Sequence, residues 1–535
     1  MQELLNRYWI WISLLTIILF TVAIRIRLLE VPLERDEGEY AYAGQLILDG
    51  VPPYAQVYNM KMPGIYVAYA LILAIFGQTH NGIHMGLLVI NAATIFVLFL
   101  IGKKLFDPTT AVVGSAAFGL LSLGQRVLGF SANAEHFVIL PALGGILFLI
   151  NAIDYRKWLS LLGAGVLLGL SFIMKQHGSV FIIFAGLYLL FSEIRRRPFS
   201  LKSLVAKGTV FLVGVLLPLA VTFLVLWWCG VFEKFWFWTF DYAREYVSAM
   251  PLSDGLKLLK MWGSLIVKSA IALWIFAGIG LTSLWWNKKA RKSRVFVIVF
   301  LLFSFLAICP GFYFRPHYFI LLLPAIALLT GIGASSTQTL LAKSQWAEKG
   351  RAITILLAFF VLFHTIYQQW NFFFIMSPTT ASRKTYGLNP FPESPEIGRF
   401  IKEHSEKNER IAVIGSEPQI YFYSNRRSAT GHIYTYALME DHGYASKMQE
   451  EMIREIESWS PKFLVFVNVH TSWLTQADSK KLIFKWFQQY HDTYYQIVGI
   501  IDIISQQETV YRWGQESENY KPRSISWLLV SQRKK

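Results

Sequence analysis

The sequence predicts an α-helical protein that crosses a membrane many times and ends in a small soluble α/β domain. Of its 535 residues, 54% are hydrophobic and only 16% are charged, whereas charged residues make up about 25% of ordinary soluble proteins. Mean hydropathy is +0.42, and long apolar runs recur from residue 8 to residue 370. Such runs require a bilayer. After Trp370 the composition returns to soluble usage.

Apolar stretches of roughly 17 to 25 residues have the length of a membrane crossing. Eleven of them lie near residues 8–29, 83–101, 110–126, 134–152, 158–174, 177–192, 205–228, 265–286, 295–312, 317–334 and 350–370. A further run at residues 63–77 is short for a crossing. We expect it to be a re-entrant or interfacial segment.

The basic loops predict the orientation. Lys103 and Lys104, and the basic clusters within residues 195–207 and 288–294, then all face the cytoplasm, in agreement with the positive-inside rule. Eleven crossings put the N-terminus in the cytoplasm and the C-terminal segment outside. Twelve or thirteen crossings remain the alternative, because hydropathy does not distinguish a re-entrant segment from a span.

The chain divides into three parts on this interpretation. Residues 1–370 form the membrane domain, whose first outer loop covers residues 30–62; residues 371–396, rich in proline, form a linker; and residues 397–535 form an extracytoplasmic α/β domain. Strands are expected at 411–414 and 463–467, with a helix over 445–459 between them. This alternation favours a partly parallel sheet.

Charge and cysteine content exclude other classes. The formal net charge is +16, but the basic residues stand in short loops between apolar runs, so they indicate orientation rather than nucleic-acid binding. The two cysteines, Cys229 and Cys309, cannot build a disulfide framework or a cysteine-based metal site.

The first outer loop carries four carboxylates within six residues: Glu34, Asp36, Glu37 and Glu39. If Asp36 begins a surface helix, it caps free N–H groups, and Glu37 or Glu39 can point into a cavity. A carboxylate there could deprotonate a hydroxyl acceptor or hold a divalent cation. The alternative is a solvated acidic loop that only caps a helix.

Other ionisable residues are expected on the same outer face. Glu135 and His136 stand at the outer end of a crossing, where such a pair is a functional candidate, although His136 could be a surface histidine. Lys61, Lys175 and Arg315 would form a cationic pocket suited to a phosphate. For any one of these three residues, the alternative is equally good that its long side chain only extends toward lipid headgroups.

Two further segments are assigned no catalytic role. Residues 232–246 contain six aromatic side chains between positions 235 and 242. We interpret this segment as an interfacial aromatic belt; the alternative is that it covers the lipid tail of a donor. Residues 415–418, Gly-Ser-Glu-Pro, open a segment of the outer domain.

Taken in order, several short elements resemble the GT-C superfamily of membrane glycosyltransferases. The branch resembled contains protein O-mannosyltransferases and the aminoarabinose transferases that act on lipid A. The elements are Asp36, Glu37 and Tyr40; Lys61-Met62-Pro63-Gly64; Glu135; Lys175-Gln176; and His317-Tyr318-Phe319 through Pro324.

The resemblance implies a GT-C membrane fold and a sugar donor linked to a polyprenyl phosphate. Asp36 would be the catalytic base or a metal-side carboxylate, with Glu37 and Glu135 as further catalytic carboxylates. Glu39, Tyr40 and His136 would be supporting residues.

The same resemblance implies that Lys61, Lys175, Arg315 and His317 bind the donor phosphate as it becomes a leaving group. The protein would be a hexosyl- or pentosyltransferase of a bacterial inner membrane with a periplasmic active site. An acceptor hydroxyl would attack the anomeric carbon with inversion. Whether the acceptor is a protein, a lipid or a polysaccharide stays open, as does the need for a divalent metal.

A transporter or flippase for an anionic polyprenyl-linked lipid is the competing function. Transporters usually place ionisable residues or broken helices near the middle of the membrane. Here the ionisable residues gather at one surface, which favours chemistry there.

Overall fold

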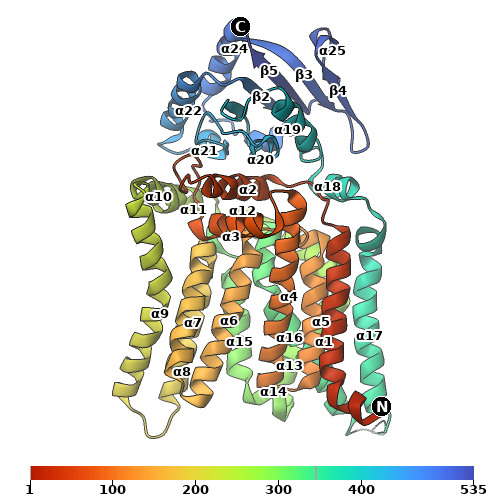
Figure 1. The fold of residues 1–535 in the computed structure, drawn as a ribbon. Coiled ribbons are helices and arrows are strands. Elements are labelled where there is room, and N and C mark those ends of the chain that lie inside the picture. The colour runs from red at the N-terminus through yellow and green to blue at the C-terminus, as the bar shows by residue number, and fades with distance from the viewer. Residues whose placement is uncertain (1, 344–345, 347, 535) are drawn as a thin grey trace.

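The computed structural model of the protein describes residues 2–534 except 344, 345 and 347. Long helices run side by side in a bundle, short helices lie across one end of that bundle, and the C-terminal domain sits on the short helices (Figure 1). The N-terminus lies at the opposite end of the bundle from the C-terminal domain.

The long helices overlap the predicted apolar stretches. Within the described part of the chain they are α1 (Gln2–Arg27), α4 (His80–Leu105), α5 (Pro108–Leu123), α6 (Ala134–Tyr155), α7 (Trp158–Met174), α8 (Ser179–Ile194), α9 (Leu201–Trp228), α13 (Ile271–Trp286), α15 (Arg294–Leu306), α16 (Leu323–Leu341) and α17 (Gly350–Gln368). The helix in the stretch predicted at 295–312 ends at Leu306, and the one in the stretch predicted at 317–334 extends from Leu323 to Leu341. Six spans among the described residues are long and apolar enough to cross a membrane, or seven if the bent pair α12 (Leu252–Lys268) and α13 is one span. The predicted polytopic helical fold is confirmed, and the number of crossings stays a prediction.

The short helices beneath the C-terminal domain include the run expected not to cross. Helix α3 (Pro63–Phe76) has 14 residues, which corresponds to about 21 Å, less than the roughly 30 Å of a hydrocarbon core. Figure 1 shows α3 lying just under α2 (Arg35–Leu48), across the end of the bundle. Beside them lie α10 (Phe232–Trp236), the π-helical turn η3 (Phe237–Tyr242) and α11 (Ala243–Ser248).

Short turns connect the long helices. They are η1 (Gln125–Val127), η2 (Gln176–Gly178), α14 (Lys288–Lys292), η4 (Pro310–Phe312) and η5 (Pro316–Leu321). Within residues 371–396, interpreted above as a linker, the chain forms the π-helical turn η6 (Asn371–Ile375) and helix α18 (Pro378–Tyr386).

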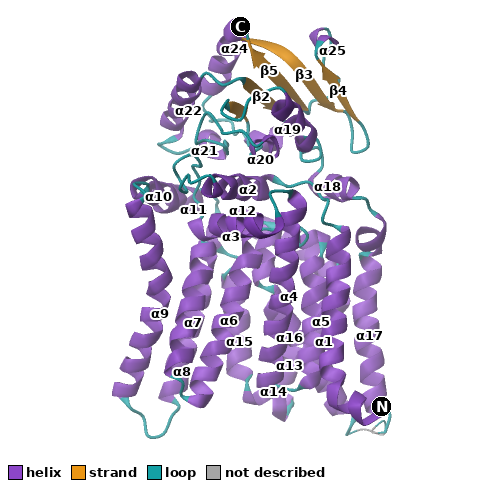
Figure 2. Ribbon diagram, viewed as in Figure 1, coloured by secondary structure: helices purple, strands orange, loops and turns teal. Residues whose placement is uncertain are grey.

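The C-terminal domain contains a five-stranded sheet in the order β1-β2-β5-β3-β4 (Figure 2). Strands β1 (Ile411–Ile414) and β2 (Phe463–Asn468) pair in parallel, as expected from the helix between them. Strands β3 (Tyr495–Ile503), β4 (Thr509–Trp513) and β5 (Trp527–Arg533) add antiparallel pairs that the sequence analysis did not predict. The helices of this domain are α19 (Ser394–Glu403), α20 (Gln419–Ser424), α21 (Tyr436–Met439), α22 (Ala445–Trp459), α23 (His470–Trp473), α24 (Leu482–Tyr494) and α25 (Gln515–Glu518).

The predicted orientation can be tested by thiol labelling. In a background with Cys229→Ser and Cys309→Ser, single cysteines are introduced as Lys407→Cys in the C-terminal domain and Lys202→Cys at the other end of the bundle; both lysines are exposed. We expect an impermeant maleimide to label only position 407 in intact cells and both positions in permeabilised cells. Labelling of position 202 alone in intact cells would show that the orientation is the reverse of the predicted one.

Candidate active site

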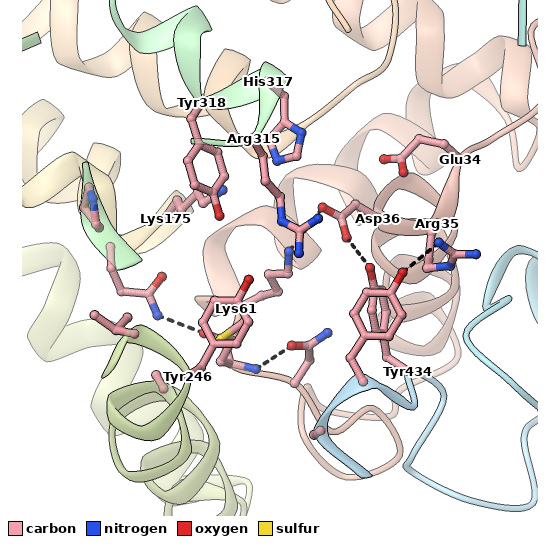
Figure 3. Close-up of a pocket in the computed structure, with 18 of the residues that line it drawn as sticks. Glu34, Arg35, Asp36, Lys61, Lys175, Tyr246, Arg315, His317, Tyr318 and Tyr434 are labelled. Carbon is pink, nitrogen blue, oxygen red and sulfur yellow. Dashed lines mark hydrogen bonds and ion pairs between the residues drawn. The ribbon is translucent and has the colours of Figure 1, made fainter. Parts of the chain in front are cut away.

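A cavity of about 330 Å³ lies where the short helices meet the C-terminal domain. Its wall combines residues from α2, the loop before α3, η2, η3, α11 and η5 with residues 434–440 of the C-terminal domain. Figure 3 shows Asp36, Lys61 and Arg315 directed toward the same space, with Tyr434 opposite them. Segments about 400 residues apart in the chain, such as Asp36 and Tyr434, therefore build one site.

Helix α2 directs Asp36 into this cavity. Its N-cap is Glu34, whose side chain accepts from the Glu37 backbone N–H at 3.3 Å, while the Glu37 carboxylate accepts from the Glu34 backbone N–H at 3.2 Å. This capping box corrects the expectation that Asp36 caps the helix. Because Glu34 and Glu37 satisfy the helix start, the Asp36 carboxylate is left for the cavity.

The structure does not bring Glu37 to the cavity. Its carboxylate also accepts from the Ala132 N–H at 2.6 Å and lies 3.0 Å from Nε2 of His84. The side chain is fully buried. Glu37 thus attaches the start of α2 to α4 and to the loop before α6.

Glu39 and Tyr40 also lie behind the cavity wall. The Glu39 carboxylate accepts hydrogen bonds from Tyr66 at 2.6 Å and from Asn59 at 2.7 Å. Burial raises the pKa of Glu39 to about 7, partly offset by Lys61. The Tyr40 ring lies under the Lys61 ammonium, which is 5.5 Å from the ring centroid.

Two groups hold the Asp36 carboxylate in place. Lys61 Nζ lies 3.3 Å from Oδ2, and the Tyr434 hydroxyl donates to Oδ1 at 3.1 Å. Burial alone would raise the pKa of Asp36, but the positive charge of Lys61 and of the other basic residues of the cavity outweighs it and holds this pKa well below its usual range. Asp36 is therefore a carboxylate at every physiological pH.

The second expected acid lies behind the cations. Glu135, in the first turn of α6, is fully buried and pairs with Lys175, and His317 Nε2 is 4.0 Å from the same oxygen. Lys175 and His317 line the cavity. Within the described part of the chain, the other Glu135 oxygen has no hydrogen-bond partner.

Arg315 and His136 differ in their surroundings. Arg315 lines the cavity, and no carboxylate in the described chain lies within ion-pair distance of its guanidinium. His136 is buried outside the cavity, where Nδ1 lies 3.1 Å from the Asn91 amide. The structure thus gathers Asp36, Lys61 and Arg315 closely and places His136 behind them.

Part of the cavity wall comes from segments that were assigned no such role. Trp238, Tyr242 and Tyr246, interpreted as an interfacial belt, line the cavity, as do Tyr434 and Tyr436 of the C-terminal domain. The aromatic side chains of residues 232–246 had an identifiable signal, but membrane anchoring explains that signal equally well. Nothing in the sequence around Tyr434 marks it as facing Asp36.

Arg35 attaches α2 to the C-terminal domain. Its guanidinium lies 2.5 Å from Glu417 Oε1, donates to the Tyr436 hydroxyl at 2.8 Å and to Asn389 Oδ1 at 3.0 Å, and also contacts the Ser416 carbonyl. Both charged side chains are almost completely buried. The sequence feature that could have indicated this ion pair is the position of Arg35 among the four carboxylates of residues 34–39.

The donor set of the cavity does not fit a divalent cation. In the described chain, no group of three or more His, Cys, Asp or Glu side chains is placed to hold a metal ion. Both Asp36 oxygens are already engaged by Lys61 and Tyr434, and the neighbouring cations would repel a metal.

Comparisons with known proteins agree with this architecture. Residues 61–228 match the family described as dolichyl-phosphate-mannose-protein mannosyltransferase, whereas no curated protein matches the chain. The chain is similar in structure to ArnT from Cupriavidus metallidurans, solved with undecaprenyl phosphate, with a TM-score of 0.60, 14% identity and coverage of 98% of each chain.

A second similar structure is the oligosaccharyltransferase of Archaeoglobus fulgidus in the apo form. It has a TM-score of 0.56 and 12% identity, over 98% of this chain and 76% of that one. The same enzyme, AglB, in complex with an inhibitory peptide and a dolichol-phosphate gives a TM-score of 0.54, also at 12% identity with the same coverage. The expected resemblance in fold is thereby confirmed.

Arg35→Ala tests the attachment of the C-terminal domain. Removing one partner of a buried ion pair leaves the other charge uncompensated and costs about 3 to 5 kcal/mol, so we expect a clearly lower unfolding temperature and faster proteolysis of the C-terminal domain. The matched control is Arg399→Ala, whose exposed pair with Glu396 is worth less than about 1 kcal/mol. Equal effects of the two substitutions would contradict the role given to Arg35.

Proposed function

We propose that this chain, a membrane protein with the GT-C glycosyltransferase fold, transfers a glycosyl group from a polyprenyl-phosphate-linked donor to a hydroxyl acceptor. The observation that carries the proposal is the cavity in which one permanently ionised carboxylate, Asp36, stands among Lys61, Lys175 and Arg315. A hexosyl and a pentosyl donor are equally compatible with it.

The charges of the cavity suit an anionic donor. Three cations face two carboxylates, those of Asp36 and Glu135. Two other acids, Glu34 and Glu440, line the wall, and burial raises the pKa of each, which opposes additional negative charge there. The excess of positive charge favours a phosphate diester and favours still more the phosphate monoester that leaves.

The lipid part of the donor is supported by the solved structures. ArnT was solved with undecaprenyl phosphate and AglB with a dolichol-phosphate. We infer that the same kind of lipid presents its phosphate to Lys61, Lys175 and Arg315, with His317 beside them. The acceptor then approaches from the wall formed by Tyr434 and Tyr436.

The chemical step follows from these positions. The acceptor oxygen forms a bond to the anomeric carbon, and the bond from that carbon to the phosphate oxygen breaks with its electron pair going to the phosphate. The acceptor proton passes toward Asp36, whose low pKa makes it an orienting hydrogen-bond acceptor until the hydroxyl becomes acidic in the transition state. Lys61 and Tyr434 keep the carboxylate in position, and Glu135 keeps Lys175 in position.

The flippase alternative is less well supported by the same geometry. The ionisable residues of the cavity belong to elements such as α2 and η5, and Figure 1 shows α2 at one end of the bundle, under the C-terminal domain. A carrier usually needs such residues near the middle of the membrane. A fixed site at the surface favours transfer.

Replacing Asp36 tests the proposed transfer directly. Asp36→Asn keeps the size of the side chain but removes its charge and its capacity to accept a proton, so we expect kcat/KM to fall by about 100-fold or more. The assay is transfer of radiolabelled sugar from a panel of polyprenyl-phosphate donors to membrane acceptors. Asp254→Asn is the matched control, because Asp254 is an exposed carboxylate paired with Lys257; full activity of Asp36→Asn would overturn the assignment.

The acid limb of the pH profile tests the environment of Asp36. Because the pKa of Asp36 is held below its usual value, its charge is lost only as the pH falls through that lowered pKa, so Asp36 causes no loss of activity between pH 8 and pH 5. The substitution Lys61→Met removes the positive charge that lowers the pKa of Asp36 most, so burial then raises this pKa. We expect the acid limb of kcat/KM to move to higher pH. An unchanged acid limb would show that protonation of Asp36 does not cause the loss of activity at low pH.

A further inference from the structure

A second large cavity lies at the end of the bundle opposite Asp36. Its volume is about 1110 Å³, and helices α1, α5, α16 and α17 form its walls. Its rim includes Lys289 of α14, which Figure 1 shows at the end far from the C-terminal domain. This opposite-end groove has no part in the proposed transfer.

The walls of the groove are mainly apolar and face the membrane. Ile12 of α1 and Ile355 and Phe359 of α17 line it and are 48%, 59% and 67% exposed. Only 22% of the apolar stretch of α1, and 22% of that of α17, is buried in the protein. Most of the apolar surface of these two helices is therefore left uncovered by the protein, and the groove between them is open to lipid.

Three cations surround the mouth of the groove: Lys289, Lys343 and Arg351. All three are exposed, and no ion pair to a carboxylate is formed by any of them within the described residues. The acid that lines the groove, Asp107, caps α5 through the Thr110 N–H at 2.9 Å and accepts from Ser335 at 2.5 Å. In the part of the chain that the structure describes, the three cations of the mouth are thus left without an ion-pair partner.

The length of the groove corresponds to one leaflet of a membrane. Along α17 it extends from Arg351 to Leu362, which is about 16 Å at 1.5 Å per residue. Half of a hydrocarbon core is about 15 Å. A lipid with its headgroup at the mouth would lay its acyl chains along the whole groove.

We propose that the opposite-end groove binds an anionic phospholipid. The headgroup phosphate is held by Lys289, Lys343 and Arg351, and the acyl chains lie between α1 and α17. An uncharged lipid or an apolar helix of another protein would fill the walls but leave the three cations without a partner. Charge complementarity therefore selects a lipid whose headgroup carries a net negative charge.

The test measures lipid retention by the full-length protein. Purified protein is exchanged into detergent with phosphatidylglycerol or phosphatidylcholine, and bound lipid is counted by native mass spectrometry. We expect phosphatidylglycerol to be retained preferentially. Lys289→Gln combined with Lys343→Gln and Arg351→Gln should weaken that binding by roughly tenfold to a hundredfold, because each cation near an anionic lipid contributes about a fivefold factor.

Two further variants separate the groove from its charges. Arg195→Gln combined with Arg197→Gln and Lys202→Gln removes three exposed cations that do not line the groove and should leave retention unchanged. Ala358→Phe fills the groove without altering charge and should also release the lipid. Equal retention of both lipids, or equal loss in the two triple variants, would overturn the proposal, and both results are independent of glycosyl transfer.

Discussion

The buried ion pair between Arg35 and Glu417 is the interaction on which the geometry of the site depends. Arg35 and Asp36 are consecutive residues in the first turn of α2, so they point in different directions from one short segment. The arginine fixes that segment to the C-terminal domain, and the aspartate faces the cavity. A buried arginine needs a partner of opposite charge, and Glu417 supplies it.

Charge balance explains why so many ionisable groups are tolerated in one place. Three buried acids of this region have a basic partner from another element: Asp36 has Lys61, Glu135 has Lys175, and Glu37 has His84. Removing a charge from water is expensive unless it is paired. These pairs offset the free-energy cost of burial. Arg315 lacks a carboxylate partner among the described residues, so its positive charge is available to a ligand.

Periodicity and hydropathy were sufficient to predict most of the long helices, because a crossing needs about 20 apolar residues and little else resembles that pattern. They did not predict the bend between α12 and α13, which falls within the stretch 265–286. The sequence also identified Asp36, Lys61 and Arg315, which line the cavity. The sequence did not show which of Asp36 and Glu37 faces the cavity. Two neighbouring acids at the start of a helix are distinguished by which one caps the helix, and here Glu37 caps it together with Glu34.

Tyr434 was missed, since its contact with Asp36 depends on docking between domains. Strands β3, β4 and β5 were missed because the apolar residues near the chain end allow several assignments.

The hydrogen bond from Tyr434 to Asp36 joins residues 398 positions apart, which has a consequence for biogenesis. When the ribosome has made α2 and the early helices, the first loop is in place but one wall of its cavity is still missing. That wall arrives only after the last long helix, α17, has been inserted and the following domain has folded. Assembly of this cavity is thus a late event in the maturation of the protein, and a chain truncated after the bundle would have an open first loop with no enclosed site.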